Sequence, residues 1–373
     1  MENNPIRVLH VLGRLDMGGA ESRTMDLYRM IDRSKVQFDF MIHTRDKCFF
    51  DDEIESLGGH IYHVPRYHFT NHFAYVKAWK KFFEEHKEIK VVHGHMTSTA
   101  GIYIPIAKEC GVGLTIAHSR SAGVPKGLKG YLTKLLRLGL YKKPDVCIGC
   151  SKLAGIGAFG QKAVDKGLVT IVPNAIDTKR FEYNENTRKA IRNELGINDS
   201  TFIVGHVGRF HESKNHEFLF KIFKEIKKEI PDSKLVLVGD GELRDQVDAW
   251  IKAIGITEDV IKTGNKKNVE DYYQAFDYFV FPSRYEGLPG TVVEAQASGL
   301  RCLMSDNITK EVMITDLVES KSISDTPEAW AKRVLETKDY ERISHSDEVK
   351  AKGFDAGAQI DFYTKLYLTG NLS

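Results

Sequence analysis

The chain has 373 residues, of which 42% are hydrophobic and 28% charged, and its formal net charge is +2. These values exclude a disordered chain and predict a soluble globular protein of two domains, because one core seldom organises so many residues. The sequence has no run of about 18 apolar residues, no secretion signal at its start and an odd number of cysteines, five. We therefore expect a cytoplasmic protein without a disulfide framework.

Charge is distributed unevenly along the chain. Residues 1–172 contain 25 Lys and Arg against 17 Asp and Glu, a balance of 25 − 17 = +8, and the remainder contains 28 against 34, or −6. A basic half is typical of contact with a polyanionic surface such as phospholipid or nucleic acid. A chance distribution of charge explains the asymmetry equally well.

Short apolar runs alternate with amphipathic stretches, which predicts strands alternating with helices. The strands expected in the first half are residues 6–12, 38–43, 91–95, 114–118, 146–150 and 169–172. The pattern then begins again, with strands expected at 202–207, 235–238, 260–263, 278–281 and 302–305. This alternation is typical of doubly wound parallel sheets, so we predict an α/β fold with two Rossmann-like domains facing across a cleft.

The predicted domain boundary lies where the alternation of strands and helices begins again. We expect an N-terminal domain over residues 1–172 and a C-terminal domain over residues 173–354, with the linker near 173–181. The last amphipathic stretch, within residues 355–373, could pack back on the first domain or stay with the second.

Paired glycines follow the first predicted strand. Gly18 and Gly19 allow close approach of the backbone to a bulky ligand at the carboxyl end of that strand. The segment is not G-x-G-x-x-G, so a nicotinamide dehydrogenase is poorly supported. A purely structural tight turn is the alternative for both glycines.

Two cations follow the first strand of the second half. Arg209 comes directly after Gly208, just past the strand, and Lys214 stands where the next helix is expected to begin. An arginine fork and a lysine point charge suit a diphosphate whose negative charge grows as it departs. Taken singly, each cation would more often be a solvated surface charge.

Two glutamates, Glu286 and Glu294, flank the change from a buried strand at 277–282 to a helix expected from Gly290 onwards. The unpaired N–H groups at the start of that helix favour an anion such as phosphate. We expect Glu294 in the first helical turn, where it can accept hydrogen bonds from a vicinal diol such as ribose. Glu286 then faces the other end of the ligand.

These motifs together resemble glycosyltransferase family 4, and the resemblance covers nearly the whole chain. It rests on Gly18-Gly19-Ala20-Glu21, Gly208-Arg209 with Lys214, the segment from Gly239 to Arg244, and the pair Glu286 and Glu294. The resemblance implies a retaining enzyme of the two-domain GT-B fold that uses nucleoside-diphosphate sugars. The N-terminal domain would bind the acceptor and the C-terminal domain the donor.

The resemblance also implies roles for individual residues. Arg209 and Lys214 would contact the diphosphate, Glu294 the ribose and Glu286 the sugar hydroxyls, with the backbone of Gly287 and Leu288 near the phosphates. Gly18, Gly19 and Gly208 would line the donor site. Pro289 has no N–H to donate to a phosphate.

His118, at the end of the fourth predicted strand, matches the position where the family often places a histidine facing the reacting sugar. It could bond a donor hydroxyl or steady the acceptor, and a structural role is the alternative. Ala175 stands where the family usually has glycine after Asn174, which lowers the weight given to a site role for Asn174.

The sequence predicts metal-independent transfer without a cofactor. No D-x-D triplet occurs, and Arg209 with Lys214 can do the work of a divalent cation on the leaving diphosphate. The pairs His93 with His95 and Cys147 with Cys150 are interpreted as structural, because zinc needs about four convergent ligands.

Residues 126–143 form a basic amphipathic stretch with six Lys and Arg and no acid. Leu128, Leu132, Leu135 and Leu136 fall on one helical face, as in a helix that rests on an anionic membrane. An ordinary helix that packs its leucines inward is the alternative. Nucleic acid is the other possible polyanionic partner, but the sequence contains no motif for its recognition.

We therefore predict a retaining glycosyltransferase that moves a hexose-type sugar from a nucleoside-diphosphate donor, expected to be a UDP-sugar. The acceptor would be a hydroxyl of a saccharide, expected to be lipid-linked, in the synthesis of a cell-surface polysaccharide or glycoconjugate. The protein would touch the inner face of the cell membrane peripherally. A nucleotide-sugar epimerase of the same fold and a non-catalytic nucleotide-sugar-binding module are the alternatives.

Overall fold

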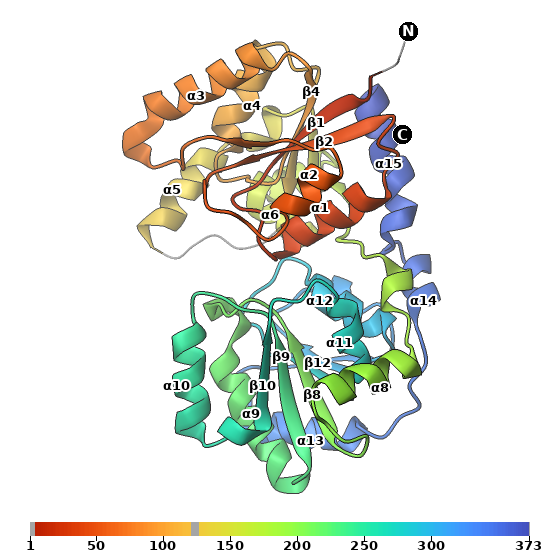
Figure 1. Cartoon of the computed structure of the whole chain (residues 1–373). Coiled ribbons are helices and arrows are strands. Elements are labelled where there is room, and N and C mark those ends of the chain that lie inside the picture. The colour runs from red at the N-terminus through yellow and green to blue at the C-terminus, as the bar shows by residue number, and fades with distance from the viewer. Residues whose placement is uncertain (1–3, 121–126, 373) are drawn as a thin grey trace. The chain divides into compact units, whose positions relative to one another are not determined.

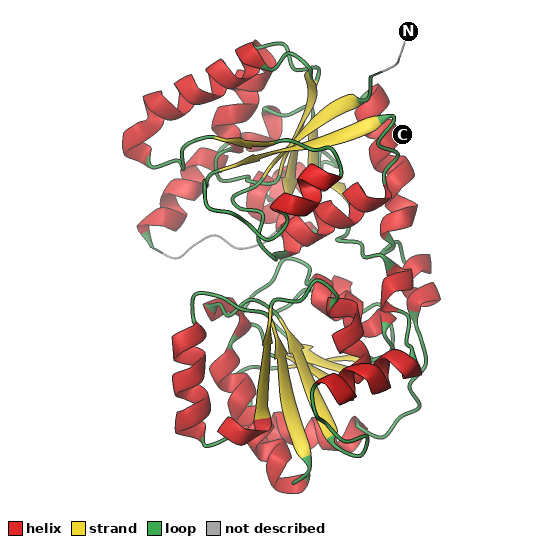
Figure 2. Ribbon diagram, in the orientation of Figure 1, coloured by secondary structure: helices red, strands yellow, loops and turns green. Residues whose placement is uncertain are grey.

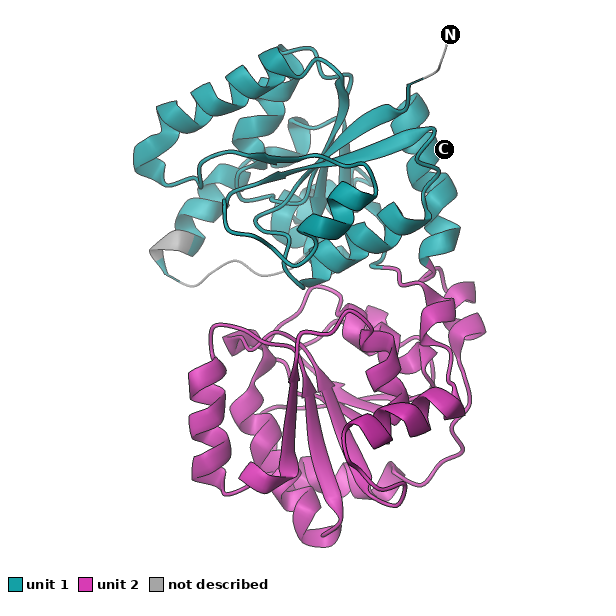
Figure 3. Cartoon of the chain, viewed as in Figure 1, with its two compact units in different colours: residues 1–174, 356–373 teal, residues 175–355 magenta. Residues whose placement is uncertain are grey.

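The structure, a computed structural model, describes residues 4–120 and 127–372, which form two compact units. Unit 1 consists of residues 1–174 and 356–373, and unit 2 of residues 175–355 (Figure 3). Each unit contains one parallel sheet covered by helices (Figures 1 and 2). The predicted α/β class with two Rossmann-like domains is confirmed.

The sheet of unit 1 has seven parallel strands in the order β3-β2-β1-β4-β5-β6-β7. The order reverses between β1 and β4, and at such a switch point the loops at the carboxyl ends of the strands diverge and leave room for a ligand. The strands are β1 (Ile6–Val11), β2 (Val36–Ile42), β3 (Ile61–His63), β4 (Ile89–Gly94), β5 (Leu114–Ser119), β6 (Val146–Gly149) and β7 (Thr170–Ile171).

The helices of unit 1 include the last helix of the chain, which packs against α1, β1 and β2. The unit thus contains both ends of the described chain. Its helices are α1 (Gly19–Met30), α2 (Asp51–Ser56), α3 (His72–Glu85), α4 (Ala100–Glu109), α5 (Leu128–Arg137), α6 (Lys152–Phe159), α7 (Gln161–Asp165) and α15 (Ala356–Thr369), with 3-10 turns η1 (Phe69–Asn71) and η2 (Leu140–Lys142).

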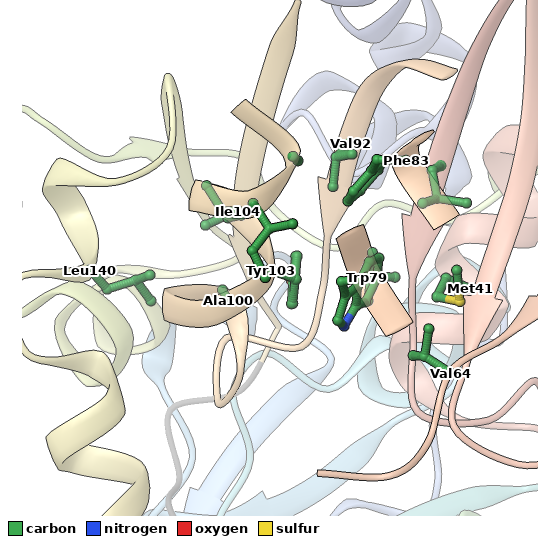
Figure 4. Packing of buried hydrophobic residues seen from close by; sticks show 14 of the residues in the cluster. Met41, Val64, Trp79, Phe83, Val92, Ala100, Tyr103, Ile104 and Leu140 are labelled. Carbon is green, nitrogen blue, oxygen red and sulfur yellow. The ribbon is translucent and has the colours of Figure 1, made fainter. Parts of the chain in front are cut away.

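One face of this sheet packs against α3 and α4 through an aromatic core (Figure 4). The ring of Trp79 is stacked 5.0 Å from Tyr103 and 5.5 Å from Phe83, and all three side chains are buried. A Cβ at Gly94 would lie 2.0 Å from the Tyr103 hydroxyl, so only glycine lets that ring lie against β4.

Unit 2 has six parallel strands in the order β10-β9-β8-β11-β12-β13, with its switch point between β8 and β11. The strands are β8 (Phe202–Val207), β9 (Ser233–Val238), β10 (Val260–Gly264), β11 (Tyr278–Phe281), β12 (Cys302–Ser305) and β13 (Val318–Lys321). The helices are α8 (Glu185–Glu194), α9 (His216–Glu229), α10 (Arg244–Ile254), α11 (Val269–Ala275), α12 (Gly290–Ala297), α13 (Pro327–Thr337) and α14 (Ser346–Ala351), with 3-10 turns η3 (Thr178–Phe181), η4 (Glu212–Lys214), η5 (Thr257–Asp259) and η6 (Lys310–Val312).

The eleven strands expected from the sequence are all present, within three residues of the expected bounds. Two further strands, β3 and β13, lie at the sheet edges and were not predicted from the sequence. Among the described residues, no helix is both long enough and apolar enough to cross a membrane.

Candidate functional site

Three of the candidate residues of unit 2, Arg209, Lys214 and Glu286, lie on segments that leave the sheet at its switch point. β8 and β11 are hydrogen-bonded neighbours and run parallel, so the loops that follow them begin at the same edge of the sheet. The loop after β8 carries Arg209 and Lys214, and the loop after β11 carries Glu286. Residues distant in sequence are brought together in this way.

Lys214 and Glu286 form an ion pair. Lys214 Nζ lies 2.8 Å from Glu286 Oε1, and both side chains are largely buried. The same ammonium lies 4.6 Å from the centroid of the Phe281 ring, at the end of β11, which adds a cation–π contact. Lys214 is therefore fixed in place at the switch point rather than extended into solvent.

Glycine at position 208 makes room for the stem of Lys214. A Cβ added there would lie 3.2 Å from Lys214 Cε and 3.3 Å from His206 Nε2, which is closer than ordinary van der Waals contact. The role of Gly208 in the structure is thus to let the lysine lie flat over the backbone.

Hydrogen bonds to backbone carbonyl groups connect the two loops. Arg284 N donates to Ser213 O at 2.7 Å, and Asn215 Nδ2 donates to Pro282 O at 3.2 Å. Asn215 has a φ of 58°, in the left-handed region that asparagine tolerates better than most residues. These contacts turn the chain from η4 into α9 and hold Lys214 opposite Glu286.

Arg209 is more exposed than Lys214 and pairs with Glu242, with Nε 2.9 Å from Oε2. Glu242 follows β9, whose loop packs tightly on the loop after β8. A Cβ at Gly239 would lie 2.2 Å from Gly208 O, and one at Gly241 would lie 2.6 Å from Phe210 O. The two glycines of the motif 239–244 thus serve this close backbone approach.

Glu294 lies in the second turn of α12, and the prediction that placed it in the first turn is wrong. The helix begins at Gly290, so Glu294 is its fifth residue, and one turn takes 3.6 residues. Its side chain is buried, and Oε2 accepts a hydrogen bond from the Tyr273 hydroxyl at 2.7 Å. Gly287 and Leu288 are buried just before this helix.

Two histidines near Lys214 were not singled out by the sequence analysis. Burial lowers the pKa of His206 to about 4 and that of His216 to about 2, and Lys214 adds to both shifts by repulsion. Both rings are therefore neutral near pH 7. The positive charge of this site comes from Lys214 and Arg209 and not from imidazolium groups.

The candidate residues of unit 1 lie at its own switch point. Gly18 is the N-cap of α1 and Gly19 its first residue. A Cβ at Gly18 would lie 2.3 Å from Glu21 Oε2, whereas a Cβ at Gly19 would meet no described atom within 4 Å. The Glu21 side chain is flexible and could move aside, so packing does not require glycine at position 18, and Gly19 leaves the backbone at the start of α1 accessible.

His118, at the end of β5, belongs to a buried group of four histidines. His118 Nδ1 lies 3.0 Å from His93 Nε2, and His10 Nδ1 lies 3.1 Å from His95 Nε2. Tyr367 of α15 completes the group with its hydroxyl 2.7 Å from His93 Nδ1. We call these four histidines, three on β1, β4 and β5 and His95 directly after β4, the histidine cluster.

All four members of the histidine cluster are neutral at pH 7. Burial lowers the pKa of His10 to about 3 and that of His93, His95 and His118 well below the ordinary value, and the nearby Arg120 lowers all four further. His118 Nε2 and His10 Nε2 are buried and have no hydrogen-bond partner among the described residues.

The contacts of the histidine cluster suit a hydrogen-bonded chain better than a metal. Ring nitrogens of His10, His93 and His95 lie within 4.8 Å of one another, which is close enough for shared ligation. However, Arg120 Nε donates to His95 Nδ1 at 3.4 Å, so the proton of His95 is on Nε2, where it faces His10. A histidine that binds a metal through Nε2 would need Nδ1 to donate instead.

The chain matches two family models. One, described as "Glycosyltransferase Family 4", covers residues 17–180, and the other, "Glycosyl transferases group 1", covers residues 187–349. The matches fall in the two halves that carry the motifs of the sequence analysis.

Three relatives carry glycosyltransferase names. EpsF of Bacillus subtilis (strain 168) is 37% identical over 339 residues, which cover 90% of this chain and 88% of that protein. The capsular polysaccharide biosynthesis glycosyltransferase CapH of Staphylococcus aureus is 26% identical, over 98% of this chain and 100% of CapH. An Escherichia coli enzyme named UDP-Gal:alpha-D-GlcNAc-diphosphoundecaprenol alpha-1,3-galactosyltransferase is 31% identical over 38% of each chain.

The fold also matches solved structures. The Anabaena protein Alr3699/HepE, crystallised with UDP and glucose, superposes with a TM-score of 0.79 at 15% identity, over 98% of this chain and 100% of that chain. From the family models, the relatives and this fold, the chain belongs to glycosyltransferase family 4 and has the GT-B fold.

Proposed function

We propose that this glycosyltransferase moves a hexose-type sugar from a UDP-sugar to a hydroxyl of a lipid-linked saccharide, with retention, in the synthesis of a cell-surface polysaccharide or glycoconjugate. The observation that carries the proposal is the buried pair of Lys214 and Glu286 at the switch point of unit 2, with Arg209 on the same loop as Lys214. The names of the CapH and E. coli relatives support the pathway, the donor and the acceptor. Retention is taken from the family resemblance.

The cations would act on the leaving group. As the anomeric bond breaks, negative charge grows on the diphosphate, and Lys214 and Arg209 stabilise that charge most in the transition state. Lys214 is already largely shielded from solvent and oriented by Glu286 and Phe281, so little reorganisation is needed when the diphosphate binds. A phosphate oxygen would take the proton of the attacking hydroxyl, and neither metal nor cofactor would take part.

The carboxylates would hold the hydroxyl groups. Glu286 would accept hydrogen bonds from the sugar once a phosphate competes for Lys214, and Glu294 would accept from the ribose. Tyr273 keeps one oxygen of Glu294 engaged and so fixes the direction of the other. Gly287 and Leu288 would present backbone N–H groups to the phosphates, and Gly19 with Gly18 would let the backbone of α1 approach the donor.

The role that we propose for His118 differs from those of the charged residues, because its ring is fully buried in unit 1. One nitrogen is engaged by His93, and Nε2 is the other; it is buried in this structure and would have to become accessible to bond a hydroxyl of the donor or acceptor. We assign it the role of positioning such a hydroxyl and not of transferring a proton, because protonation of this ring is strongly disfavoured.

The proposal includes peripheral contact of α5 with an anionic membrane. Tyr131, Leu135 and Leu138 are exposed by 62%, 45% and 69%. Leu132 and Leu136 are half-buried, so the predicted leucine face is split between the protein and solvent. Lys126 and the side chain of Leu128, which were part of that prediction, lie outside the described residues.

Two of the cations of this basic stretch support the protein itself. Arg137 donates to Gly157 O and Thr97 Oγ1, and Lys143 donates to Gly101 O. Lys134 is exposed on α5 between the apolar side chains, as a headgroup contact requires. The basic stretch is thus partly structural and partly available to an anionic surface.

Activity of variants tests the proposal. Arg209→Ala and Lys214→Ala should each lower the rate of nucleoside-diphosphate release with a lipid-linked acceptor by about 100-fold. Lys262→Ala, in an exposed ion pair of β10 with Asp248, is the matched control and should keep the parent rate. Parent rates in both site variants would refute the assignment.

The choice of donor and the two alternative functions need a second experiment. Ligand-detected NMR with a panel of nucleotide sugars, without acceptor, should show selective binding of UDP-sugars. An epimerase would convert the donor into a new nucleotide sugar under these conditions, whereas a binding module would bind the donor and never release nucleoside diphosphate when an acceptor is added.

A further inference from the structure

An unusual feature of unit 1 is a pair of exposed phenylalanines between β3 and α3. Phe73 is 88% exposed and Phe69 is 43% exposed, although both are large apolar side chains. Phe69 lies in η1 and Phe73 in the first turn of α3. Together with the neighbouring Tyr67, we call them the aromatic ridge.

The aromatic ridge projects from an ordered turn. Asn71 closes the turn, since its Oδ1 accepts from His68 N at 2.7 Å and its Nδ2 donates to Arg66 O at 2.9 Å. The Tyr67 ring lies 5.2 Å from Phe69 and 5.0 Å from the buried Tyr75. The exposure of the two phenylalanines is therefore a property of the fold and not of a loose segment.

The surroundings of the ridge are basic. Residues 56–83 contain no Asp or Glu, and they include Arg66, Lys77, Lys80 and Lys81, all of them exposed. Lys80 and Lys81 reach Glu109 and Glu85 only at 3.5 and 3.7 Å in solvent-exposed pairs, which contribute little and are easily exchanged for other anions. Aromatic rings flanked by an excess of exposed cations match the boundary between acyl chains and anionic headgroups.

The ridge and the exposed face of α5 belong to the same helical layer. α4 packs against both α3 and α5, and these helices gather on one side of unit 1 (Figure 1). Both segments combine exposed apolar side chains with exposed cations. We propose that the aromatic ridge is a second membrane contact, which inserts Phe69 and Phe73 into an anionic bilayer beside α5.

This inference rests on the membrane contact of α5 in the proposed function and adds a separate site to it. Exposed aromatic rings can also form part of a carbohydrate-binding site, which is the alternative interpretation of the ridge. Sites for small molecules are concave and cover most of the ligand, whereas a ring 88% exposed at the start of a helix lines no such hollow. The observations therefore favour the bilayer.

Vesicle flotation of the full chain tests the inference. With vesicles of phosphatidylcholine containing about one-third phosphatidylglycerol, the double variant Phe69→Ser with Phe73→Ser should reduce the bound fraction by about fivefold or more. Leu168→Ser, which changes another half-exposed apolar residue of unit 1, is the matched control and should bind as the parent does. Unchanged flotation of the double variant would overturn the inference.

A third variant separates this inference from the proposed function. If Leu135→Ser with Leu138→Ser abolishes flotation while the ridge variant floats as the parent, α5 alone binds the membrane and the ridge inference fails. If neither variant alters flotation, the membrane part of the proposed function fails as well. Thermal unfolding and circular dichroism of each variant should match the parent, because the changed side chains are exposed.

Insertion can also be observed directly. Phe73→Trp places a fluorophore in the ridge, and its emission should shift to the blue and be quenched by brominated lipids when anionic vesicles are added. Absence of quenching in bound protein would overturn the inference. So would a ridge variant that floats as the parent but has a raised KM for a water-soluble saccharide acceptor, because that result assigns the rings to the acceptor.

Discussion

At the scale of single residues, the site of unit 2 depends on how Lys214 is held. Three neighbours restrict it: Glu286 by charge, Phe281 by its ring and Gly208 by its missing side chain. Glu286 and Phe281 attract the ammonium, and Gly208 makes the position sterically possible. A change at Gly208 therefore tests the position of the lysine without removing any charge.

Gly208→Ala should lower kcat/KM by about tenfold, because the new methyl group displaces the stem of Lys214 by a few tenths of an ångström. The lysine stem is flexible, so the free energy of unfolding should change little. Gly113→Ala is the control, since its nearest contact, Lys90 O at 3.6 Å, is an ordinary one. Steady-state kinetics and urea unfolding measure both effects, and an unchanged kcat/KM would show that the lysine position does not limit the reaction.

Two tyrosines of α15 form a natural pair for a second test. The hydroxyl of Tyr367 bonds His93 Nδ1 at 2.7 Å, whereas the buried hydroxyl of Tyr363 has no partner among the described residues. Tyr367→Phe leaves a buried ring nitrogen unpaired and should cost about 2 kcal/mol of unfolding free energy. Tyr363→Phe should cost nothing measurable. Equal losses in urea unfolding of the two variants would contradict this account of the bond.

At the scale of elements, β1, β4 and β5 place the histidine cluster against α15. The groups that face the cluster are Arg120, Tyr363 and Tyr367. Arg120 opposes protonation by its charge, and burial opposes it more strongly, so the folded protein keeps all four rings neutral. The unfolded chain protonates the same rings near pH 6.5.

Stability should consequently fall as the pH drops below about 6.5, because the unfolded chain then binds more protons than the folded protein. For His10 this window extends down to its folded pKa of about 3. Each neutral histidine contributes a slope of up to about 1.4 kcal/mol per pH unit. Above pH 7 these groups should contribute no pH dependence.

Urea unfolding between pH 7.5 and 5 measures this slope. His10→Gln removes one titrating ring and should flatten the slope by up to about 1.4 kcal/mol per pH unit. A slope that does not respond to His10→Gln would show that other groups govern acid stability. His206 and His216 add to the slope from unit 2 in the same direction.

Elements buried in the middle of the sheets could be predicted from the sequence, because apolar runs such as that of β11 leave few other interpretations. The edge strands β3 and β13 could not, since β3 is three residues long and β13 is Val-Glu-Ser-Lys. Such segments become strands only because a neighbour is present to pair with them. The start of α12 at Gly290 was predicted correctly, but Glu294, its fifth residue, was assigned to the first turn instead of the second.

Candidate residues for the site could be chosen from the sequence, but their contacts could not be predicted. Arg209, Lys214, Glu286 and Glu294 could be chosen by their positions after strands, whereas the pairing of Lys214 with Glu286 joins residues that only the sheet order brings together. The buried Tyr273 and His10 had no local signal, and nothing in the sequence joined His93, His95 and His118 into one group. Their polar atoms meet partners from distant strands and helices, which a one-dimensional pattern does not contain.

At the scale of the whole molecule, the chain enters unit 2 after Asn174 and returns to unit 1 at Ala356. Near these two crossings, hydrogen bonds join the outgoing and the returning chain segments within each unit. Ile176 N donates to Phe354 O at 2.9 Å and Thr178 Oγ1 to Asp355 Oδ2 at 2.6 Å within unit 2. Within unit 1, Gln359 Nε2 donates to Pro173 O at 3.0 Å. The ends of each unit therefore lie side by side.

This arrangement predicts how the protein can be divided. Residues 175–355 should fold alone and unfold cooperatively, because the unit is continuous and its ends are paired. Residues 1–174 alone should be markedly less stable, since removal of α15 exposes the histidine cluster and leaves His93 without Tyr367. A short glycine linker from Asn174 to Ala356 should restore unit 1, because Pro173 and Gln359 are already in contact.

Urea unfolding of the three fragments measures these differences. The linked unit 1 should show a higher midpoint than residues 1–174, and Tyr367→Phe within the linked fragment should lower that midpoint as it does in the full chain. If residues 1–174 unfold at the same midpoint as the linked fragment, α15 is dispensable to unit 1. The isolated unit 2 should still bind a UDP-sugar by ligand-detected NMR, and Lys214→Ala should weaken that binding, because Arg209, Lys214, Glu286 and Glu294 all lie between Ala175 and Asp355.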